Sequence, residues 1–205
     1  MPDVREPRLH TVPIAELRPT QMTVGLREVT AKRNEWREAG DHHQSVFLGS
    51  HMIPVVKGPR DRLYVIDHHH LCRALLEAGQ TEVEVTVVAN LAKLAREPFW
   101  VFMDNRGWLH PYDAEGKRCP WDELPKRIAD MADDPYRSLA GALRRTGGYA
   151  KDTTPFSEFL WADFLRRRIK PGRIERHYDK ALADALLLAK SADADFLPGW
   201  CGPSD

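Results

Sequence analysis

Hydrophobic and polar positions follow two distinct periods along the first half of the chain. Strand-like segments lie at residues 9–14, 52–57, 62–66 and 82–88, and the last of them alternates cleanly between apolar and polar side chains. Helical spacing recurs over residues 22–39, before a polar break at 40–45, and again after Asp67. The predicted order is strand, helix, hairpin, helix and strand, which is typical of a small α/β unit.

The second half of the chain changes to helical patterns with aromatic and leucine stripes, which we interpret as packing surfaces. Helices are predicted at residues 91–104, 125–131, 135–145, 155–169 and 174–190, and an irregular aromatic link is predicted at 107–113. We therefore predict the fold class α/β (α+β). It comprises an α/β domain with a small mixed sheet at residues 1–90 and a helical C-terminal region at 91–205 that packs on it.

The segment around Asp67 carries the candidate chemistry. A short apolar strand stops at this residue, three histidines follow, and the helix they begin ends naturally at Gly79. The N-terminus of a helix offers unpaired N–H groups and a partial positive charge, so this corner is a candidate anion site. A metal site is disfavoured, because only Asp67 and His70 share a helix face and no HExxH or CxxC spacing occurs.

Composition limits the partners. Lysine plus arginine equals aspartate plus glutamate at 30 each, so a nucleic-acid surface would have to be a local patch such as Arg144-Arg145 or Arg166-Arg167-Arg168. The three cysteines are scattered, which argues against a disulfide framework. No apolar run reaches membrane length and the first residues do not form a signal peptide, so we expect a cytoplasmic protein with no membrane partner.

Five segments together resemble the ParB/sulfiredoxin superfamily, and in particular its ParB-like nuclease branch. They are residues 17–21 (Leu-Arg-Pro-Thr-Gln), 64–70 (Tyr-Val-Ile-Asp-His-His-His), 134–141 (Asp-Pro-Tyr-Arg-Ser-Leu-Ala-Gly), 147–151 (Gly-Gly-Tyr-Ala-Lys) and 155–163 (Pro-Phe-Ser-Glu-Phe-Leu-Trp-Ala-Asp). The resemblance spans nearly the whole chain. It implies a ParB/sulfiredoxin-like N-terminal domain whose strand-to-helix corner holds nucleotide phosphates.

The corner resembles the Asp-Gly-His-His-Arg sequence of the free-serine kinases in this superfamily, with two departures. Asp67, His69 and His70 match it, whereas His68 stands where glycine is usual and Leu71 stands where an arginine follows. Arg73 is the candidate for the missing cation. The sulfiredoxin cysteine is absent, which argues against that activity.

The resemblance and the corner chemistry together define the predicted site. The predicted catalytic residues are His69, His70, Asp67 and Glu16, and the predicted phosphate- or nucleotide-binding residues are His68, Arg73, Gln21, Arg18 and Lys32. Asp104, Lys151, Glu158 and Asp163 are polar groups of the helical half that could close over the site. The expected cofactor is Mg²⁺ with ATP or ADP, because phosphoryl transfer depends on positioning and on positive charge.

Three functions remain open at the level of sequence. The favoured one is a nucleotide-dependent phosphotransferase or nucleotidase acting on a small molecule. A DNA-associated nuclease or partition-type clamp is the second, and it would need a basic groove and usually a helix-turn-helix module. The third is a non-catalytic binding module that retains the fold. The oligomeric state is not predicted.

Overall fold

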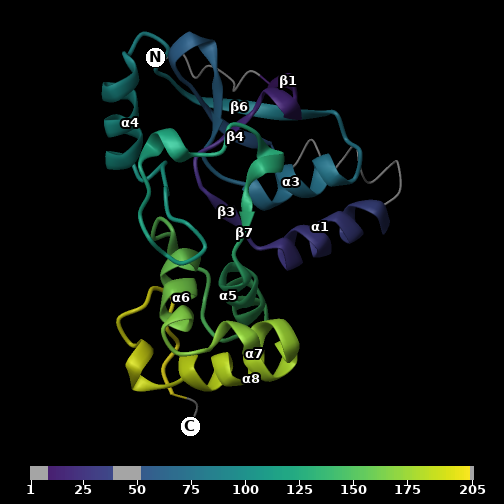
Figure 1. Cartoon of the computed structure of the whole chain (residues 1–205), viewed down its shortest axis with the longest axis vertical. Helices are drawn as coiled ribbons and strands as arrows, with labels where there is room; N and C mark the ends of the chain where they lie inside the picture. The colour runs from purple at the N-terminus through teal and green to yellow at the C-terminus, as the bar shows by residue number, and fades with distance from the viewer. Residues whose placement is uncertain (1–8, 39–51, 204–205) are drawn as a thin grey trace, which may run out of the picture.

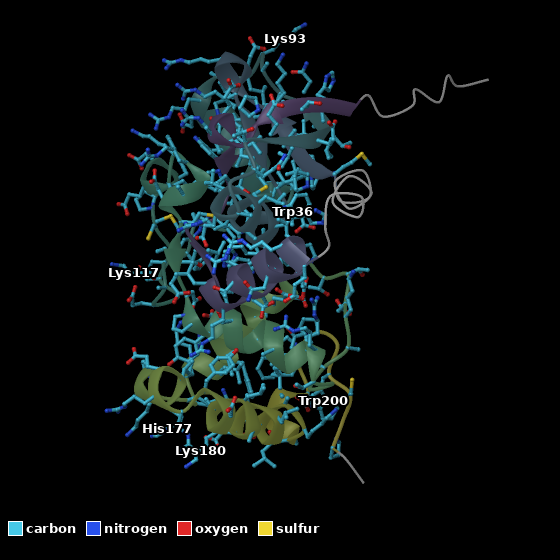
Figure 2. The ribbon with its side chains drawn as sticks, turned by 90° about the vertical axis from the view of Figure 1, so that its right-hand side faces the viewer. Trp36, Lys93, Lys117, His177, Lys180 and Trp200 are labelled. Atoms are coloured by element: carbon cyan, nitrogen blue, oxygen red, sulfur yellow. The ribbon has the colours of Figure 1, made fainter. Side chains whose placement is uncertain are left out.

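The computed structural model describes residues 9–38 and 52–203, so the polar break predicted at 40–45 lies outside the described residues. The molecule is elongated, with a β-sheet towards one end and a group of helices at the other (Figure 1). Lys93 marks the sheet end, and His177 and Lys180 mark the helical end (Figure 2). In the described ranges, no helix is long and apolar enough to cross a membrane.

Five strands form one mixed sheet in the order β1-β6-β4-β5-β2. β1 (Leu9–Pro13) runs antiparallel to β6 (Glu82–Asn90), which lies parallel to β4 (Ile53–Lys57). β4 pairs antiparallel with β5 (Leu63–Val65), and β5 pairs parallel with β2 (Arg18–Pro19). The predicted hairpin and the predicted mixed sheet are confirmed.

Both faces of the sheet are covered by helices. Neighbouring residues of a strand point to opposite faces, so they belong to different cores. Val55 and Val65 belong to a core shared with helices α1 (Leu26–Glu38) and α3 (His69–Glu77). On the other face, Tyr64 packs against Phe99 and Trp100 of helix α4 (Arg96–Asn105), with ring centroids 4.8 and 5.3 Å away.

The helical half has a core of its own. It is built by α5 (Pro135–Arg145), α6 (Ser157–Arg166), α7 (Pro171–Arg176) and α8 (Tyr178–Ala189). Its centre includes the buried Tyr149 and Trp161, whose rings stack with centroids 4.3 Å apart. Helix α4 packs on the sheet, whereas these four helices pack on one another. The division into two domains at residue 90 stays a prediction.

The segment 20–25, which we call the strap, joins the two halves. Within it, β3 (Thr23–Val24) pairs in parallel with β7 (Ala132–Asp133), just before α5 begins. A Cβ atom on Gly25 would lie only 2.6 Å from the Ser138 backbone nitrogen, so the strap and α5 are in close contact there. Helix α1 therefore starts at Leu26 and not at residue 22, because the preceding residues pair as a strand.

Other helix boundaries also differ from the sequence prediction. Of the helix predicted at 125–131, only the short 3₁₀ turn η4 (Ile128–Asp130) forms, since the chain continues into β7. Phe156 caps α6, so Pro155 precedes that helix instead of beginning it. The predicted 174–190 helix is divided at His177, whose φ and ψ of −144° and 57° are not helical. The remaining 3₁₀ turns are η1 (Ile14–Glu16), η2 (Pro59–Asp61), η3 (Trp121–Glu123) and η5 (Ala192–Ala194).

Gly58 provides a test of the packing between the sheet and α4. A Cβ atom at this position would lie 2.7 Å from the rings of both Phe99 and Tyr64. Gly58→Ala should lower the free energy of unfolding by roughly 1–3 kcal/mol, because an inserted methyl overpacks a filled core. Denaturant unfolding measures the loss. In the double variant with Phe99→Leu, the loss should be smaller than the sum of the two single losses. Strict additivity would contradict this account.

Candidate functional site

The corner between β5 and α3 has an unusual backbone. His68 caps α3 in the left-handed region, with φ and ψ of 64° and 26°. For a residue with a Cβ atom, this conformation costs roughly 1–2 kcal/mol, and glycine adopts it freely. His68 therefore keeps the backbone geometry that a glycine would provide. Asp67 is not the cap predicted from the sequence, because its carboxylate accepts a hydrogen bond from the adjacent His68 N–H at 2.6 Å.

His69 and His70 hold the strap against the start of α3. The Nε2 atom of His69 accepts a hydrogen bond from the Thr20 N–H at 3.2 Å, and the Nε2 atom of His70 accepts one from the Gly25 N–H at 2.9 Å. An imidazole nitrogen that accepts a hydrogen bond carries no proton, so each neutral ring is protonated at Nδ1. Both histidines are thus built into the wall of the site.

Burial keeps these two imidazoles uncharged. Loss of hydration lowers the pKa of His69 to about 3 and lowers the pKa of His70 well below its ordinary value. The nearby Arg137 guanidinium is the second cause of both pKa shifts. The positive charge in this part of the site therefore resides on Arg137 and not on the histidines.

The corner opens on a cavity of about 820 Å³ between the sheet half and the helical half. Of the predicted site residues, Gln21, Lys32, Asp67, His68, His69 and His70 line it. Its other walls come from α1, α5, residues 107–108 and residues 151–159. A volume of this size fits a small-molecule ligand. Lys151 and Glu158 line it as well, whereas Asp104 and Asp163 do not.

Three predicted residues do not line the cavity. Arg73 points to η4, where its guanidinium donates to the carbonyls of Ile128 (3.3 Å), Ala129 (2.7 Å) and Met131 (3.3 Å). This arginine supports the fold and does not replace the cation missing from the corner. Glu16 is exposed in η1, and Arg18 lies in the edge strand β2.

Arg137 of α5 is the main residue that the sequence prediction missed. Its side chain is only 4% exposed, yet in the described part of the chain it makes a single hydrogen bond, to Gln21 Oε1 at 3.3 Å. Glu158 lies 3.7 Å away, the face of Phe159 lies 3.4 Å from the guanidinium carbon, and Nε has no hydrogen-bond partner. A guanidinium carries five N–H donors, so most of its capacity is unused. Burial lowers the pKa of Arg137, and Glu158 opposes that shift.

The neighbouring charges are mostly paired. Arg144 lies 2.9 Å from Glu158, and Arg145 binds the buried Glu28. Within the described residues, Lys32 and Lys151 also line the cavity and take part in no ion pair. The cavity thus combines fixed ion pairs with two available lysines and an under-bonded arginine.

One local signal could have identified Arg137. It belongs to the segment 134–141, whose resemblance to the family was noted, and it lies among apolar residues of a short helix. Every residue from 136 to 143 proves to be buried. A charged residue within such a segment is either paired or functional. The sequence does not reveal that the partner segments come from residues 20–25 and 156–159.

The structure defines a mixed α/β protein with a ParB-like fold, in which a five-stranded mixed sheet is followed by a helical C-terminal region. The chain belongs to the family described as "Putative ParB-like nuclease", whose model matches residues 10–167. The predicted family and fold class are confirmed.

Two solved structures give further comparisons. The chain is similar to protein Atu1540 from Agrobacterium tumefaciens, with 53% identity, a TM-score of 0.92, and coverage of 98% of this chain and 100% of that one. It is also similar to the C-terminally truncated chromosome-partitioning protein ParB from Caulobacter crescentus complexed with CTP-gamma-S, with 12% identity and a TM-score of 0.33. That match covers 91% of this chain and 94% of the ParB chain, and a likeness this weak supports no functional conclusion. No curated protein matches the sequence.

The neutral state of His69 predicts a pH dependence of stability. In the unfolded chain this histidine takes up a proton near its ordinary pKa of 6.5, but in the folded chain only near 3. Its contribution to stability is therefore complete above pH 6.5 and is lost as the pH falls from 6.5 towards 3, by roughly 1.4 kcal/mol per pH unit.

His69→Gln keeps an acceptor but removes the titrating group. The unfolding free energy of this variant, measured by urea denaturation, should fall less steeply with decreasing pH than that of the wild type. His10→Gln, at an exposed position of β1, is the matched control and should keep the wild-type slope. Equal slopes for His69→Gln and the wild type would show that this account is wrong.

Proposed function

We propose that the protein binds a nucleotide in the cavity and transfers or hydrolyses one of its phosphoryl groups at the start of α3. The observation that carries this proposal is the under-bonded, buried Arg137 beside the N-terminus of α3. Burying a charge with few partners is unfavourable, so an arginine in this state is suited to an anionic ligand that completes its hydrogen bonds.

The position of Arg137 supports a role for it in place of the arginine that is absent at Leu71. The resembling corner sequence has an arginine there, and in this chain a leucine fills the position. Arg137 comes from α5 instead, and its charge lies close enough to lower the pKa of both His69 and His70. A guanidinium binds phosphate oxygens through paired N–H groups, so it can serve where the corner arginine would.

The backbone supplies the rest of the phosphate site. The first N–H groups of any helix have no intrahelical acceptor, and here they belong to His69, His70 and Leu71, all of which line the cavity. Together with Lys32, they give positive partial charge around the oxygens of a transferred phosphoryl group. Glu35 lines the same cavity and is the candidate for accepting a proton from the attacking hydroxyl or water.

Mg²⁺ fits this proposal as a partner of the nucleotide. Among the described residues, no group of three or more histidine, cysteine or acidic side chains is placed to hold a metal ion. Mg²⁺ usually binds through one or two carboxylates together with substrate phosphates, so a complete protein cage is not required. Asp67 is the carboxylate at the corner that would hold it, and the ion would neutralise charge on the phosphates.

The family description raises phosphodiester hydrolysis in DNA as the alternative. The cavity argues for a small ligand, because Arg144 and Arg145 are held in ion pairs with Glu158 and Glu28, and Arg137 also lies 3.7 Å from Glu158. A non-catalytic binding module would share the ligand site and lack turnover. Both alternatives, and the cytoplasmic location, stay predictions.

A thermal-shift panel of ATP, ADP, CTP, GTP and AMP, with and without Mg²⁺, tests the proposal. At least one nucleotide should stabilise the wild type, and turnover should appear as phosphate release with that nucleotide. Arg137→Lys keeps the charge but loses the paired donors, so it should weaken binding roughly 10- to 100-fold, the range expected for charge-assisted hydrogen bonds.

Arg73→Lys is the matched control, because Arg73 lies near the corner but faces η4. It should change the midpoint of the free protein and leave the ligand-induced increase intact. The absence of any nucleotide effect on the wild type would refute the proposal. Binding without turnover would favour a binding module, and salt-sensitive retention of DNA would favour the nuclease.

A further inference from the structure

A second part of the same cavity is aromatic, and its place beside the phosphate corner identifies a class of ligand. We propose that Trp108 and Phe156 form a stacking subsite for the nucleobase of the bound nucleotide. This inference rests on the proposed function, because it assumes that the phosphates bind at the start of α3. It adds the side chains that would recognise the nucleobase and so select a nucleotide over other phosphate esters.

The aromatic side chains adjoin the corner. Ile66 directly precedes Asp67, and both Ile66 and Trp108 line the cavity and pack against the same cluster around Tyr64 and Phe99. The Trp108 backbone N–H donates to the Met103 carbonyl at 2.9 Å, which fixes it to the end of α4. The corner and the tryptophan are therefore parts of one continuous wall.

Phe156 reaches this wall from the helical half. A Cβ atom on Gly107 would lie 3.4 Å from Pro155 and 3.9 Å from the Phe156 ring, so the segments 107–108 and 155–156 are neighbours. The Phe156 ring also packs on His110, with centroids 4.8 Å apart. The His110 backbone N–H donates to the Thr20 carbonyl at 2.9 Å, which connects Phe156 to the strap.

The backbone at Phe156 indicates that the ring position is constrained. Its φ of 60° is left-handed, as is the φ of 64° at His68, so two non-glycine residues with this conformation line one cavity. Such conformations are unfavourable and persist only where the surroundings impose them. Phe156 and Trp108 are both half-buried and both line the cavity, and the Arg106 guanidinium carbon lies 4.9 Å from the centroid of the Trp108 ring.

The distribution of charge orients the ligand. Lys32, Glu35, Arg144 and Arg145 line the walls contributed by α1 and α5, whereas Ile66, Trp108, Pro155 and Phe156 contribute apolar side chains, with Lys151, Asp152 and Glu158 as polar neighbours. A molecule with a charged end and a flat apolar end matches these two parts, and a nucleotide has this composition. Stacking uses the ring face, which every base offers, so the subsite should favour purines by contact area and discriminate weakly within each class.

Calorimetric titration of ATP, CTP and inorganic tripolyphosphate tests the subsite, because the three ligands share a triphosphate chain. The wild type should bind ATP most tightly and tripolyphosphate most weakly. Trp108→Ala should weaken ATP binding roughly 5- to 150-fold, the range for loss of base stacking, and leave tripolyphosphate binding unchanged. Phe156→Gly, which suits the left-handed backbone, should act in the same direction.

Trp121→Ala is the matched control, since Trp121 is half-buried against Trp100 and does not line the cavity. It should leave the ratio of ATP to tripolyphosphate affinity unchanged. If tripolyphosphate binds the wild type as tightly as ATP does, the stacking subsite is refuted and the proposed function stands. If Trp108→Ala and Phe156→Gly weaken both ligands equally, stacking is again refuted. If the wild type binds none of the three ligands, the stacking subsite is refuted and the panel of the previous section decides the proposed function.

Discussion

The two hydrogen bonds from the strap to His69 and His70 hold the architecture of the site together. Without an unprotonated Nε2 on each imidazole, the N–H groups of Thr20 and Gly25 would lose their acceptors. The strap would then lose its attachment to α3. Because the strap also pairs with β7, the same two bonds align the sheet half with α5 and hence with Arg137.

The strap explains why the neutral histidines and the buried arginine occur together. Gln21, the second residue of the strap, accepts a hydrogen bond from the Arg137 guanidinium, and the Phe159 ring packs against the same group. The His110 ring packs on the Phe159 ring, with the two centroids 3.6 Å apart. Burial lowers the pKa of His110 to about 3, so this ring is neutral as well. The neutral histidines add no positive charge to the cavity, so its positive charge lies on Arg137, on the ion-paired Arg144 and Arg145, and on Lys32 and Lys151.

The limits of sequence reasoning follow from the same contacts. Local patterns predicted the strands β1, β4, β5 and β6 and the helix α5, since period and capping are encoded within each segment. They missed the two-residue strands β2, β3 and β7, which depend on pairing between distant segments. They placed the candidate site at residues 67–70 because a strand, a short polar break and a helix are adjacent in the chain. They failed for Arg73 and Arg137, whose roles depend on contacts with segments more than 50 residues distant, at η4 and at the strap. The local pattern around Ile128–Asp130 predicted a helix, but only a 3₁₀ turn forms there. The residues that follow pair with the strap, and this pairing overrides the local preference.

His68 shows how a departure in sequence can leave geometry intact. A histidine stands where the resembling motif has a glycine, yet His68 adopts the left-handed conformation that a glycine would. Although a leucine stands at position 71, Arg137 from α5 contributes a guanidinium to the cavity on which the corner opens. The helical half supplies Arg137 to this cavity, so residues of both halves form its walls. A truncated sheet half would lack Arg137, Phe156 and Lys151, and we conclude that the cavity exists only when the two halves are joined.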